Sequence, residues 1–351
     1  MTQTKQLQIK NRSIGDGNPA YLIAEMSANH AGDMGRALEI IHAAKESGAD
    51  CIKIQTYTPD TITMNCNNEF FTLSGGTWKG ENLYELYGKA YTPWEWQGRL
   101  KEEADKIGID FFSTPFDKTA VDFLEELKVD FYKIASFEVV DIPLLKAVAA
   151  TQKPIIMSVG MATTEEIEEA MKAIYSQGNT QLAILKCSSV YPAIPDTMNL
   201  KTLQDMKERF GVPVGLSDHS MGNIAAVTAV VLGANIIEKH FCLSRDIENP
   251  DVSFSMEPGE FAEMVKNIRL AEKAMGKVSY ELSSAEKESR NTRKSIFVSA
   301  DIKKGEVLTP ENIRVVRPAY GMEPKYYEMV LGKKVKEDLK FGTPLSFDVI
   351  E

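Results

Sequence analysis

Two of the four histidines in this chain end apolar runs at corresponding points of successive segments. His219 ends the stretch VGLSDH, His240 ends IIEKH, and a helix-forming segment separates them. Neutral imidazoles bind divalent metals, and oxygen ligands such as Glu25 or water would complete a shell suited to Mn²⁺ or a similar ion. An equally open alternative is that both histidines are buried below the rim of the core, with their hydrogen bonds made within the protein, because this spacing is not a specific metal-binding motif.

Polar and charged residues also end the other apolar runs. Residues two apart on a strand share a face, so Lys53 pairs with Gln55 and Ser217 with His219. A single strand-end lysine is more often simply exposed, but three converging lysines would repel each other unless an anion lay between them. A phosphate or carboxylate ligand is therefore expected, with serine hydroxyls as neutral donors. The set expected at one mouth is Glu25, Lys53, Gln55, Ser113, Thr114, Lys133, Ser136, Ser158, Lys186, Ser217, His219, Glu238 and His240.

The remaining reactive residue types give weaker signals. Cys187 is disfavoured as a nucleophile because no paired base is visible in the sequence. His30 lies in a loop where it could cap or position, and His42 lies in a helical pattern, which favours a structural role. Neither metal nor disulfide spacing is present among the cysteines, which predicts reduced cytoplasmic thiols at Cys51, Cys66, Cys187 and Cys242.

The elements that must position these residues alternate along the chain between about residue 20 and residue 280. Eight short Val/Ile-rich runs are separated by segments with apolar residues at helical spacing, such as residues 34–48 and 163–178. This alternation predicts a parallel sheet, and eight units in about 260 residues favour a (β/α)₈ TIM barrel. A doubly wound open sheet is the alternative, but no G-x-G-x-x-G follows the first strand.

Two segments depart from the alternation. Residues 67–96 are rich in Gly, Asn and aromatic residues and follow the second strand, which on a barrel predicts a lid over the active-site face. After residue 280 the pattern changes to short strands and Gly turns, although LTPEN is typical of a helix start. We expect a barrel domain over 1–280, a polar linker over 281–293 and a small β-rich domain over 294–351.

Bulk composition limits the functional class. The chain has 351 residues and a net charge of −10, which disfavours nucleic-acid and anionic-membrane partners. The N-terminus lacks the apolar core of a signal peptide, and the most apolar stretch is shorter than the ~20 residues that span a bilayer. A cytoplasmic enzyme acting on an anionic small molecule is expected.

A run of motifs in order resembles the sialic acid synthase family over nearly the whole chain. The motifs are AEMSANHAGD, IKIQTYTPDT, FFSTPFD, YKIASFE, MSVGMAT, KCSSVYP, GLSDHS, EKHF and ENPDVSFSMEP. The resemblance implies a phosphoenolpyruvate-dependent (β/α)₈ barrel followed by an antifreeze-like (SAF) domain. It also implies a divalent metal, Mn²⁺ before Mg²⁺ or Co²⁺.

Within the family, Phe137 and the insert resemble the pseudaminic acid synthase branch, because the N-acetylneuraminate enzymes usually have Gly at the Phe137 position. The implied sugar is 2,4-diacetamido-2,4,6-trideoxy-L-altrose. N-acetylneuraminate and legionaminic acid synthases share most of the motifs and stay as alternatives. A Schiff-base aldolase that uses Lys133 or Lys186 is a rival from another class, and a carbohydrate-binding protein without activity is a further one.

The resemblance also implies roles for individual residues. His219 and His240 would be the metal ligands, and Glu25 a catalytic residue that orients or deprotonates water. Arg317 would reach the partner's active site in a domain-swapped homodimer. The implied phosphoenolpyruvate contacts are Lys53, Thr114, Lys133, Ser136, Ser158 and Ser217. The implied sugar-site or metal-site residues are Glu25, Gln55, Asn82, Glu138, Tyr191 and Asp251.

Overall fold

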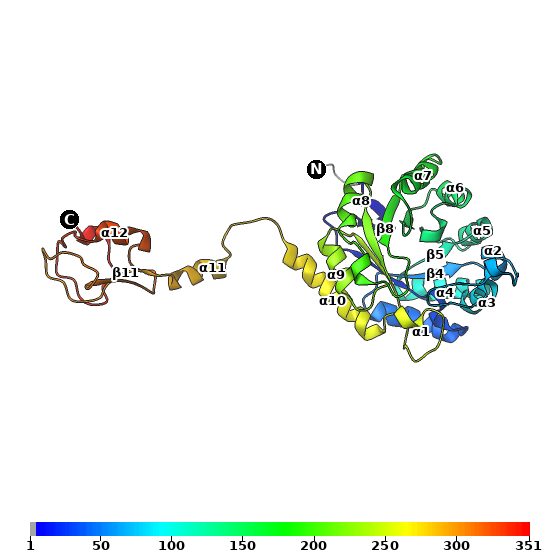
Figure 1. Ribbon diagram of the computed structural model, residues 1–351, viewed down its shortest axis with the longest axis horizontal. Coiled ribbons are helices and arrows are strands. Elements are labelled where there is room, and N and C mark those ends of the chain that lie inside the picture. Colours follow the sequence, from blue (N-terminus) through cyan, green and yellow to red (C-terminus); the bar gives the residue numbers. More distant parts are fainter. Residues whose placement is uncertain (1–4) are drawn as a thin grey trace. The chain divides into compact units, whose positions relative to one another are not determined.

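A computed structural model describes residues 5–351 and divides the chain into two compact units, one ending at Gly276 and one spanning Lys277–Glu351. The first unit is a closed barrel of eight parallel strands, in the order β10-β3-β4-β5-β6-β7-β8-β9 (Figure 1). The predicted (β/α)₈ barrel is confirmed, and each of the eight apolar runs forms one of its strands. The barrel strands are β3 (Tyr21–Glu25), β4 (Cys51–Thr56), β5 (Asp110–Pro115), β6 (Tyr132–Ile134), β7 (Ile155–Ser158), β8 (Leu182–Cys187), β9 (Val214–Asp218) and β10 (Ile236–His240).

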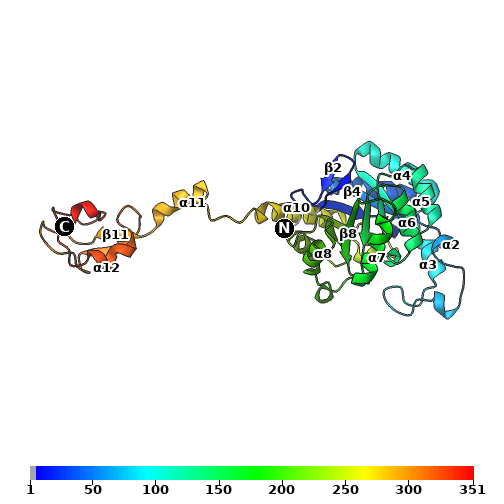
Figure 2. The same cartoon turned by 90° about the horizontal axis from the view of Figure 1, so that it is seen from above.

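Helices surround the barrel, as Figures 1 and 2 show from two sides. Helix α7 begins with a capping box, in which Thr163 and Glu166 satisfy each other's backbone amides, and its apolar stripe faces the strands. None of the helices within residues 5–351 is long and apolar enough to cross a bilayer. The helices of this unit are α1 (Met34–Glu46), α2 (Pro59–Ile62), α3 (Leu83–Ala90), α4 (Trp94–Ile107), α5 (Lys118–Glu126), α6 (Ile142–Ala150), α7 (Thr164–Tyr175), α8 (Thr202–Phe210), α9 (Ile224–Val231) and α10 (Pro258–Met275).

The strands present alternate side chains to the helices and to the barrel interior. On β4, Ile52 and Ile54 pack outward in the layer between strands and helices, while Cys51 belongs to the interior cluster. The interior is filled near the amino ends of the strands by aromatic rings, with Phe112 and Phe131 stacked at 4.2 Å between ring centroids. Apolar filling therefore occupies one end of the barrel, and the polar strand ends are left to the other.

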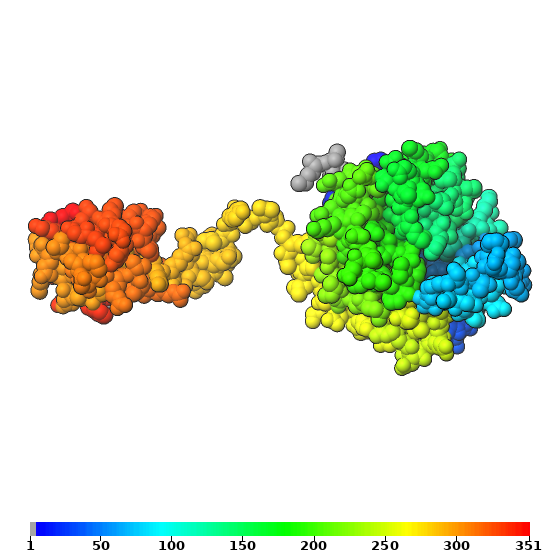
Figure 3. Space-filling view, viewed as in Figure 1, coloured from blue at the N-terminus to red at the C-terminus, as the bar shows by residue number. Residues whose placement is uncertain are grey.

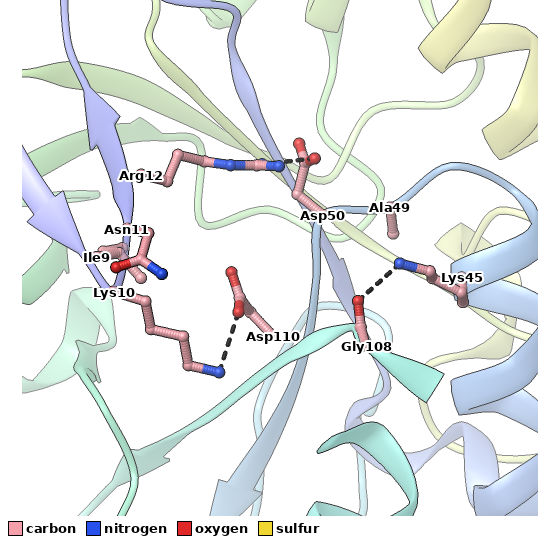
Figure 4. A pocket seen from close by; sticks show the side chains of 9 residues that line it. All are labelled: Ile9, Lys10, Asn11, Arg12, Lys45, Ala49, Asp50, Gly108 and Asp110. Carbon is pink, nitrogen blue, oxygen red and sulfur yellow. Dashed lines mark hydrogen bonds and ion pairs between the residues drawn. The ribbon is translucent and has the colours of Figure 1, made fainter. Parts of the chain in front are cut away.

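A short antiparallel hairpin that was not predicted closes the amino end of the barrel. Strands β1 (Leu7–Ile9) and β2 (Arg12–Ile14) insert Leu7, Ile9 and Ile14 into the interior cluster. A cavity of about 350 Å³ lies beside this hairpin (Figure 4). Each cation that points into it already has a partner: Lys10 contacts Asp110, Arg12 contacts Asp50, and Lys45 donates to the Gly108 carbonyl. The cavity lies at the end opposite to the polar strand ends.

The second unit contains the two-stranded sheet of β11 (Ser295–Val298) and β12 (Ile313–Val316), isolated bridges and the short helix α12 (Tyr327–Val330). The predicted linker is partly helical, because Ser283 and Glu286 form a capping box that starts α11 (Ser284–Ser289). The prediction that LTPEN starts a helix is wrong. Those residues form a turn in which the Asn312 side chain accepts a hydrogen bond from the Thr309 amide, and β12 begins directly afterwards.

Candidate active site

Two lysines and two glutamates from four strands form an ionic cluster inside the barrel. Lys53 Nζ lies 2.5 Å from Glu25 Oε2 and 3.7 Å from Glu238 Oε1. Lys133 Nζ lies 3.2 Å from the same Glu238 oxygen, which also accepts from the Ser217 hydroxyl at 3.3 Å. All four ionisable side chains are almost fully buried. Buried charges at this density are costly unless they are paired, and here they are paired with each other.

Burial and mutual attraction set the protonation of this cluster. Burial would lower the pKa of Lys53, but the carboxylates of Glu238 and Glu25 outweigh burial and raise it. Burial lowers the pKa of Lys133 despite its contact with Glu238. Burial raises the pKa of Glu25 although Lys53 lies beside it. Groups displaced in opposite directions within one cluster are typical of functional sites.

Hydroxyl and amide groups surround the lysines. Thr114 accepts a hydrogen bond from Lys53 at 3.3 Å, and Gln55 donates to Glu25 at 3.0 Å and to Ser27 at 2.9 Å. Ser27 was not among the predicted residues, since it lies beyond the strand end rather than on it.

The next two strand ends carry serines. The Gly160 amide donates to the Ser136 hydroxyl at 3.0 Å, and a Cβ at Gly160 would lie 2.9 Å from that oxygen and 2.4 Å from the Ser189 hydroxyl. The hydroxyl of Ser158 is buried without a hydrogen-bond partner among residues 5–351. Such an orphaned donor at a strand end is expected where a ligand binds.

The two histidines lie side by side at the ends of β9 and β10, with ring centroids 5.3 Å apart. Burial and repulsion from His219 hold the pKa of His240 well below its ordinary value, so its imidazole is neutral. Its Nδ1 atom is buried, has no hydrogen-bond partner among residues 5–351, and lies 3.9 Å from Asp251 Oδ2. His219 differs, because its Nδ1 atom contacts the Ser188 carbonyl at 3.2 Å.

The histidine pair fits a metal ion in part. A neutral imidazole with an unpartnered nitrogen is a suitable ligand, and a second imidazole lies next to it. Within residues 5–351, however, no three side chains of His, Cys, Asp or Glu come together closely enough to hold an ion by themselves. Oxygen atoms of substrate or water would have to supply the remaining ligands. Glu25, the predicted oxygen ligand, has its two carboxylate oxygens against Lys53 and Gln55.

The insert after β4 covers the histidine side of the mouth, as predicted for a lid. Trp78 packs against Tyr191, with 5.5 Å between ring centroids, and its Nε1 donates to the Pro250 carbonyl at 2.9 Å. Tyr191 in turn packs on His219 at 4.4 Å. Figure 3 shows the insert in light blue beside the green part of the barrel, with a recess between them.

Asn82, the predicted sugar contact in the insert, is the N-cap residue of α3. Its side-chain oxygen accepts from the amides of Tyr84 and Glu85 at the start of α3, and its nitrogen donates to the Cys66 carbonyl at 2.8 Å. Both polar atoms are thus engaged in holding the loop, and among residues 5–351 they make no hydrogen bond to the ionic cluster.

Two residues of the predicted strand-end set, Lys186 and Ser113, point away from the barrel interior. Lys186 lies on the outer face of β8, where its Nζ donates to the Cys187 carbonyl at 3.3 Å, and Ser113 bonds Thr56 and the Ile54 carbonyl outside the barrel. Only two lysines converge, because Lys186 alternates with Leu185, which belongs to the interior cluster. Burial lowers the pKa of Lys186, but its position on the outer face of β8 disfavours it as a Schiff-base nucleophile at the mouth.

Cys187 does have a neighbouring base, contrary to the prediction. Its Sγ lies 3.8 Å from His219 Nδ1. The two side chains meet because Cys187, at the end of β8, and His219, directly after the neighbouring strand β9, both point into the barrel interior. Burial alone would raise the pKa of Cys187, but the contact with His219 outweighs burial and lowers it to about 7. The pairing crosses two strands, which is why sequence spacing did not reveal it.

The remaining histidines are structural. His30 is buried, accepts from the Gly32 amide at 3.1 Å and packs on Trp96. His42 pairs with Glu103 on the helical surface at 3.1 Å. Arg317 is exposed directly after β12 in the second unit, and within residues 5–351 its guanidinium makes neither a hydrogen bond nor an ion pair.

Comparisons with known proteins agree with this architecture. The NeuB family model matches residues 40–280, and the SAF domain model matches residues 293–351. A pseudaminic acid synthase of Campylobacter jejuni is 47% identical over 93% of this chain and 95% of its own length. The pseudaminic acid synthase of Helicobacter pylori is 45% identical over 95% and 98%, respectively. An N,N'-diacetyllegionaminic acid synthase of Legionella pneumophila is less similar, at 34% identity over 96% of both chains.

Solved structures share this fold. An N-acetylneuraminic acid synthetase from Leptospira borgpetersenii superposes with a TM-score of 0.73 at 32% identity, covering 82% of this chain and 95% of that one. The spore coat polysaccharide biosynthesis protein SpsE of Bacillus subtilis has a TM-score of 0.68 at 32% identity, with 99% of both chains covered.

Proposed function

Because this chain belongs to the NeuB family and carries a C-terminal SAF domain, we propose that it is a pseudaminic acid synthase. The reaction is the condensation of phosphoenolpyruvate with 2,4-diacetamido-2,4,6-trideoxy-L-altrose to give pseudaminic acid and phosphate. The observation that carries the sugar assignment is the 45% and 47% identity to synthases of that name along almost the whole chain. The observation that supports the chemistry is the buried lysine, glutamate and serine cluster inside the barrel mouth.

Phosphoenolpyruvate is assigned to the lysine side of the mouth. Lys53 and Lys133 would offset its negative charges, and the hydroxyls of Ser158 and Ser217 would donate to its oxygens. Thr114 and Ser136 complete the set assigned to this ligand. Glu25 and Glu238 now neutralise the lysines, so an anionic ligand must compete with them. Its arrival disfavours the charged form of Glu25, whose pKa burial already raises.

The sugar is assigned to the side of the insert and the histidines. Gln55, Tyr191 and Asp251 supply amide, phenol and carboxyl groups there, and Glu138 supplies a further carboxyl. A divalent cation, Mn²⁺ before Mg²⁺ or Co²⁺, is proposed at His219 and His240, where it would act as a Lewis acid on the sugar aldehyde oxygen.

The reaction then needs little beyond positioning and proton movement from the protein. C3 of phosphoenolpyruvate bonds to the aldehyde carbon as the C2–C3 double bond gives up its electron pair, and the protonated carboxyl of Glu25 gives its proton to the aldehyde oxygen. Water adds to the cationic C2 that results, and it gives a proton to Glu25. The tetrahedral C2 then breaks its bond to the phosphate-bearing oxygen, and the proton of its hydroxyl passes to the departing phosphate, which leaves hydrogen phosphate and a 2-keto acid. Holding both reactants at one mouth replaces a bimolecular encounter.

A product assay tests the sugar assignment. The enzyme is incubated with phosphoenolpyruvate, Mn²⁺ and one of three sugars: N-acetylmannosamine or either of the two 2,4-diacetamido-trideoxy hexoses that lead to pseudaminic and legionaminic acid. We expect phosphate release to be fastest with the L-altrose compound, and mass spectrometry to identify pseudaminic acid. A preference for N-acetylmannosamine would overturn the sugar assignment and leave the reaction class intact.

One observation favours a Schiff-base aldolase as a second candidate: burial lowers the pKa of Lys133, as in lysines that form imines. Borohydride treatment in the presence of a 2-oxo acid separates the two mechanisms. The proposed synthase forms no imine, so no mass increase is expected on the peptide that contains Lys133. A trapped adduct would support the aldolase.

We also propose that two copies form a domain-swapped dimer in which Arg317 completes the partner's site. Several large apolar side chains at the barrel mouth are exposed, which is typical of a surface that another chain covers. They include Phe137 and Met161, each 60% exposed, and Ile194, 56% exposed. Arg317, which is exposed and has no ion-pair partner within residues 5–351, suits the anionic reactants of this site.

A further inference from the structure

Three loops meet in an aromatic wall that extends from the histidine pair to the insert. Trp78 comes from the insert after β4, Tyr191 from the loop after β8, and Phe254 from the loop after β10. The ring centroids of Trp78 lie 5.5 Å from Tyr191 and 6.3 Å from Phe254, and those two rings lie 5.2 Å apart. Phe254 also packs on His240 at 4.9 Å.

Trp78 is held in this wall by more than ring packing. Its indole donates to the Pro250 carbonyl, and the neighbouring Thr77 hydroxyl donates to the Tyr191 carbonyl. Residues 74–77, 79 and 80 are exposed, whereas Trp78 is partly buried. Trp78 is therefore the side chain that attaches this exposed part of the insert to the mouth of the barrel.

The loop itself is closed by its own backbone. The Leu73 amide donates to the Glu81 carbonyl at 3.0 Å, and the Gly80 amide returns to the Leu73 carbonyl at 2.8 Å. This pinning restricts Trp78 to a small range of positions above Tyr191. A restricted indole loses little side-chain entropy on binding, which favours a recognition role.

We propose that Trp78 determines sugar specificity by forming with Tyr191, backed by the buried ring of Phe254, the apolar surface against the C6 methyl and an acetamido methyl of the sugar. This inference rests on the proposed function. A 6-deoxy sugar presents a methyl group where N-acetylmannosamine presents a hydroxyl, and the Trp78 indole offers that hydroxyl no hydrogen-bond acceptor, since its one polar atom is a donor bonded to the Pro250 carbonyl. A methyl group in an apolar pocket is worth a factor of about 10–200 in kcat/KM, and rejecting a hydroxyl can add a factor of about 100 at most.

The test compares kcat/KM of three enzymes with the trideoxy sugar and with N-acetylmannosamine, at saturating phosphoenolpyruvate. Trp78→Ala is expected to lower kcat/KM for the trideoxy sugar by about 10–100-fold and that for N-acetylmannosamine by no more than about threefold. Phe70→Ala is the matched control, because Phe70 lies in the same insert and is 79% exposed. The ratio of kcat/KM for the trideoxy sugar to kcat/KM for N-acetylmannosamine should be the same in Phe70→Ala as in the wild type.

Two further measurements keep the inference separate from folding and from the proposed function. Trp78→Phe keeps a ring but loses the bond to Pro250, and it should retain most of the preference. The KM for phosphoenolpyruvate should stay unchanged in all variants. Equal losses with both sugars in Trp78→Ala, or no loss, would overturn the role of Trp78. A wild-type preference for N-acetylmannosamine would instead overturn the proposed function.

Discussion

At the scale of single residues, the site combines charges that neutralise each other with polar atoms that have no partner. Lys53, Lys133, Glu25 and Glu238 satisfy one another, while the Ser158 hydroxyl and His240 Nδ1 have no hydrogen-bond partner within residues 5–351. The charges of the first group are therefore neutralised within the protein. The second group indicates where reactants and a cation would make contacts that the protein alone does not provide.

The histidine pair leads to a prediction about metal. Chelated and dialysed enzyme should be inactive, and Mn²⁺ should restore turnover. His240→Ala should also lose most Mn²⁺ binding in equilibrium dialysis, because the buried Nδ1 atom of His240 has no hydrogen-bond partner in the part of the chain that the structure describes. His42→Ala is the control, since His42 lies on the helical surface beside Glu103. Full activity after exhaustive chelation would contradict the metal assignment.

Glu138 leads to a prediction about pH. Burial raises the pKa of this carboxyl from 4.5 to about 7, and one of its oxygens has no hydrogen-bond partner among residues 5–351. A raised folded-state pKa gives stability that is complete below 4.5 and lost as pH rises through 7. Glu138→Gln removes this dependence. The wild type should lose about 2–3 kcal/mol of its free energy of unfolding between pH 5 and pH 8 relative to Glu138→Gln, because only the wild type carries the titrating carboxyl.

Urea unfolding at both pH values measures the difference. Glu126→Gln is a suitable control, because Glu126 is an exposed glutamate at the end of helix α5. A stability difference that stayed constant with pH would show that Glu138 is ionised throughout.

At the scale of elements, the ends of β9 and β10 are joined behind the histidines by a second buried ion pair. Lys239 Nζ lies 2.8 Å from Asp218 Oδ2, and neither side chain is exposed. Asp218 also accepts from the Ser220 amide, and Lys239 donates to the Ser220 carbonyl. Each member precedes a histidine and points to the opposite face of the strand. The pair therefore fixes the backbone from which both imidazoles project.

Removing one member should cost much more than removing both. Lys239→Met leaves the Asp218 carboxylate buried and unpaired, which should lower the free energy of unfolding by about 3–5 kcal/mol. The double variant Asp218→Asn/Lys239→Met should recover a large part of that loss while still binding Mn²⁺ more weakly than the wild type. Denaturant unfolding and Mn²⁺ dialysis measure the two effects. Equal destabilisation by the single and double variants would show that the charges are not coupled.

The elements also show what sequence could predict. The eight barrel strands were predictable because each is a continuous apolar run bounded by helices. The β1–β2 hairpin was not, because strands of three residues carry too little alternation. Lys186 was misplaced because its face depends on the register within β8. The Cys187–His219 contact was missed because it crosses between strands, which no spacing within one segment reveals.

At the scale of the whole molecule, an acidic chain must attract an acidic substrate. The net charge is −10, so long-range attraction cannot concentrate phosphoenolpyruvate at the mouth. Affinity must come from short-range contacts in a buried site, where Coulomb interactions are stronger than in water. A further cation supplied by another copy of the chain would add to Lys53 and Lys133, and Arg317 is the candidate.

Complementation between two inactive chains tests whether Arg317 acts in the partner's site. Arg317→Ala and His219→Ala should each have little activity at low sugar concentration, the first through a raised sugar KM. In a swapped dimer, the mixed species has one site with an intact barrel and an intact arginine. Co-expression in equal amounts should therefore restore about one quarter of the wild-type sites, since half of the dimers are mixed. Light scattering should give twice the 39.0 kDa chain mass. A monomer, or no recovery in the mixture, would mean that Arg317 does not act across subunits.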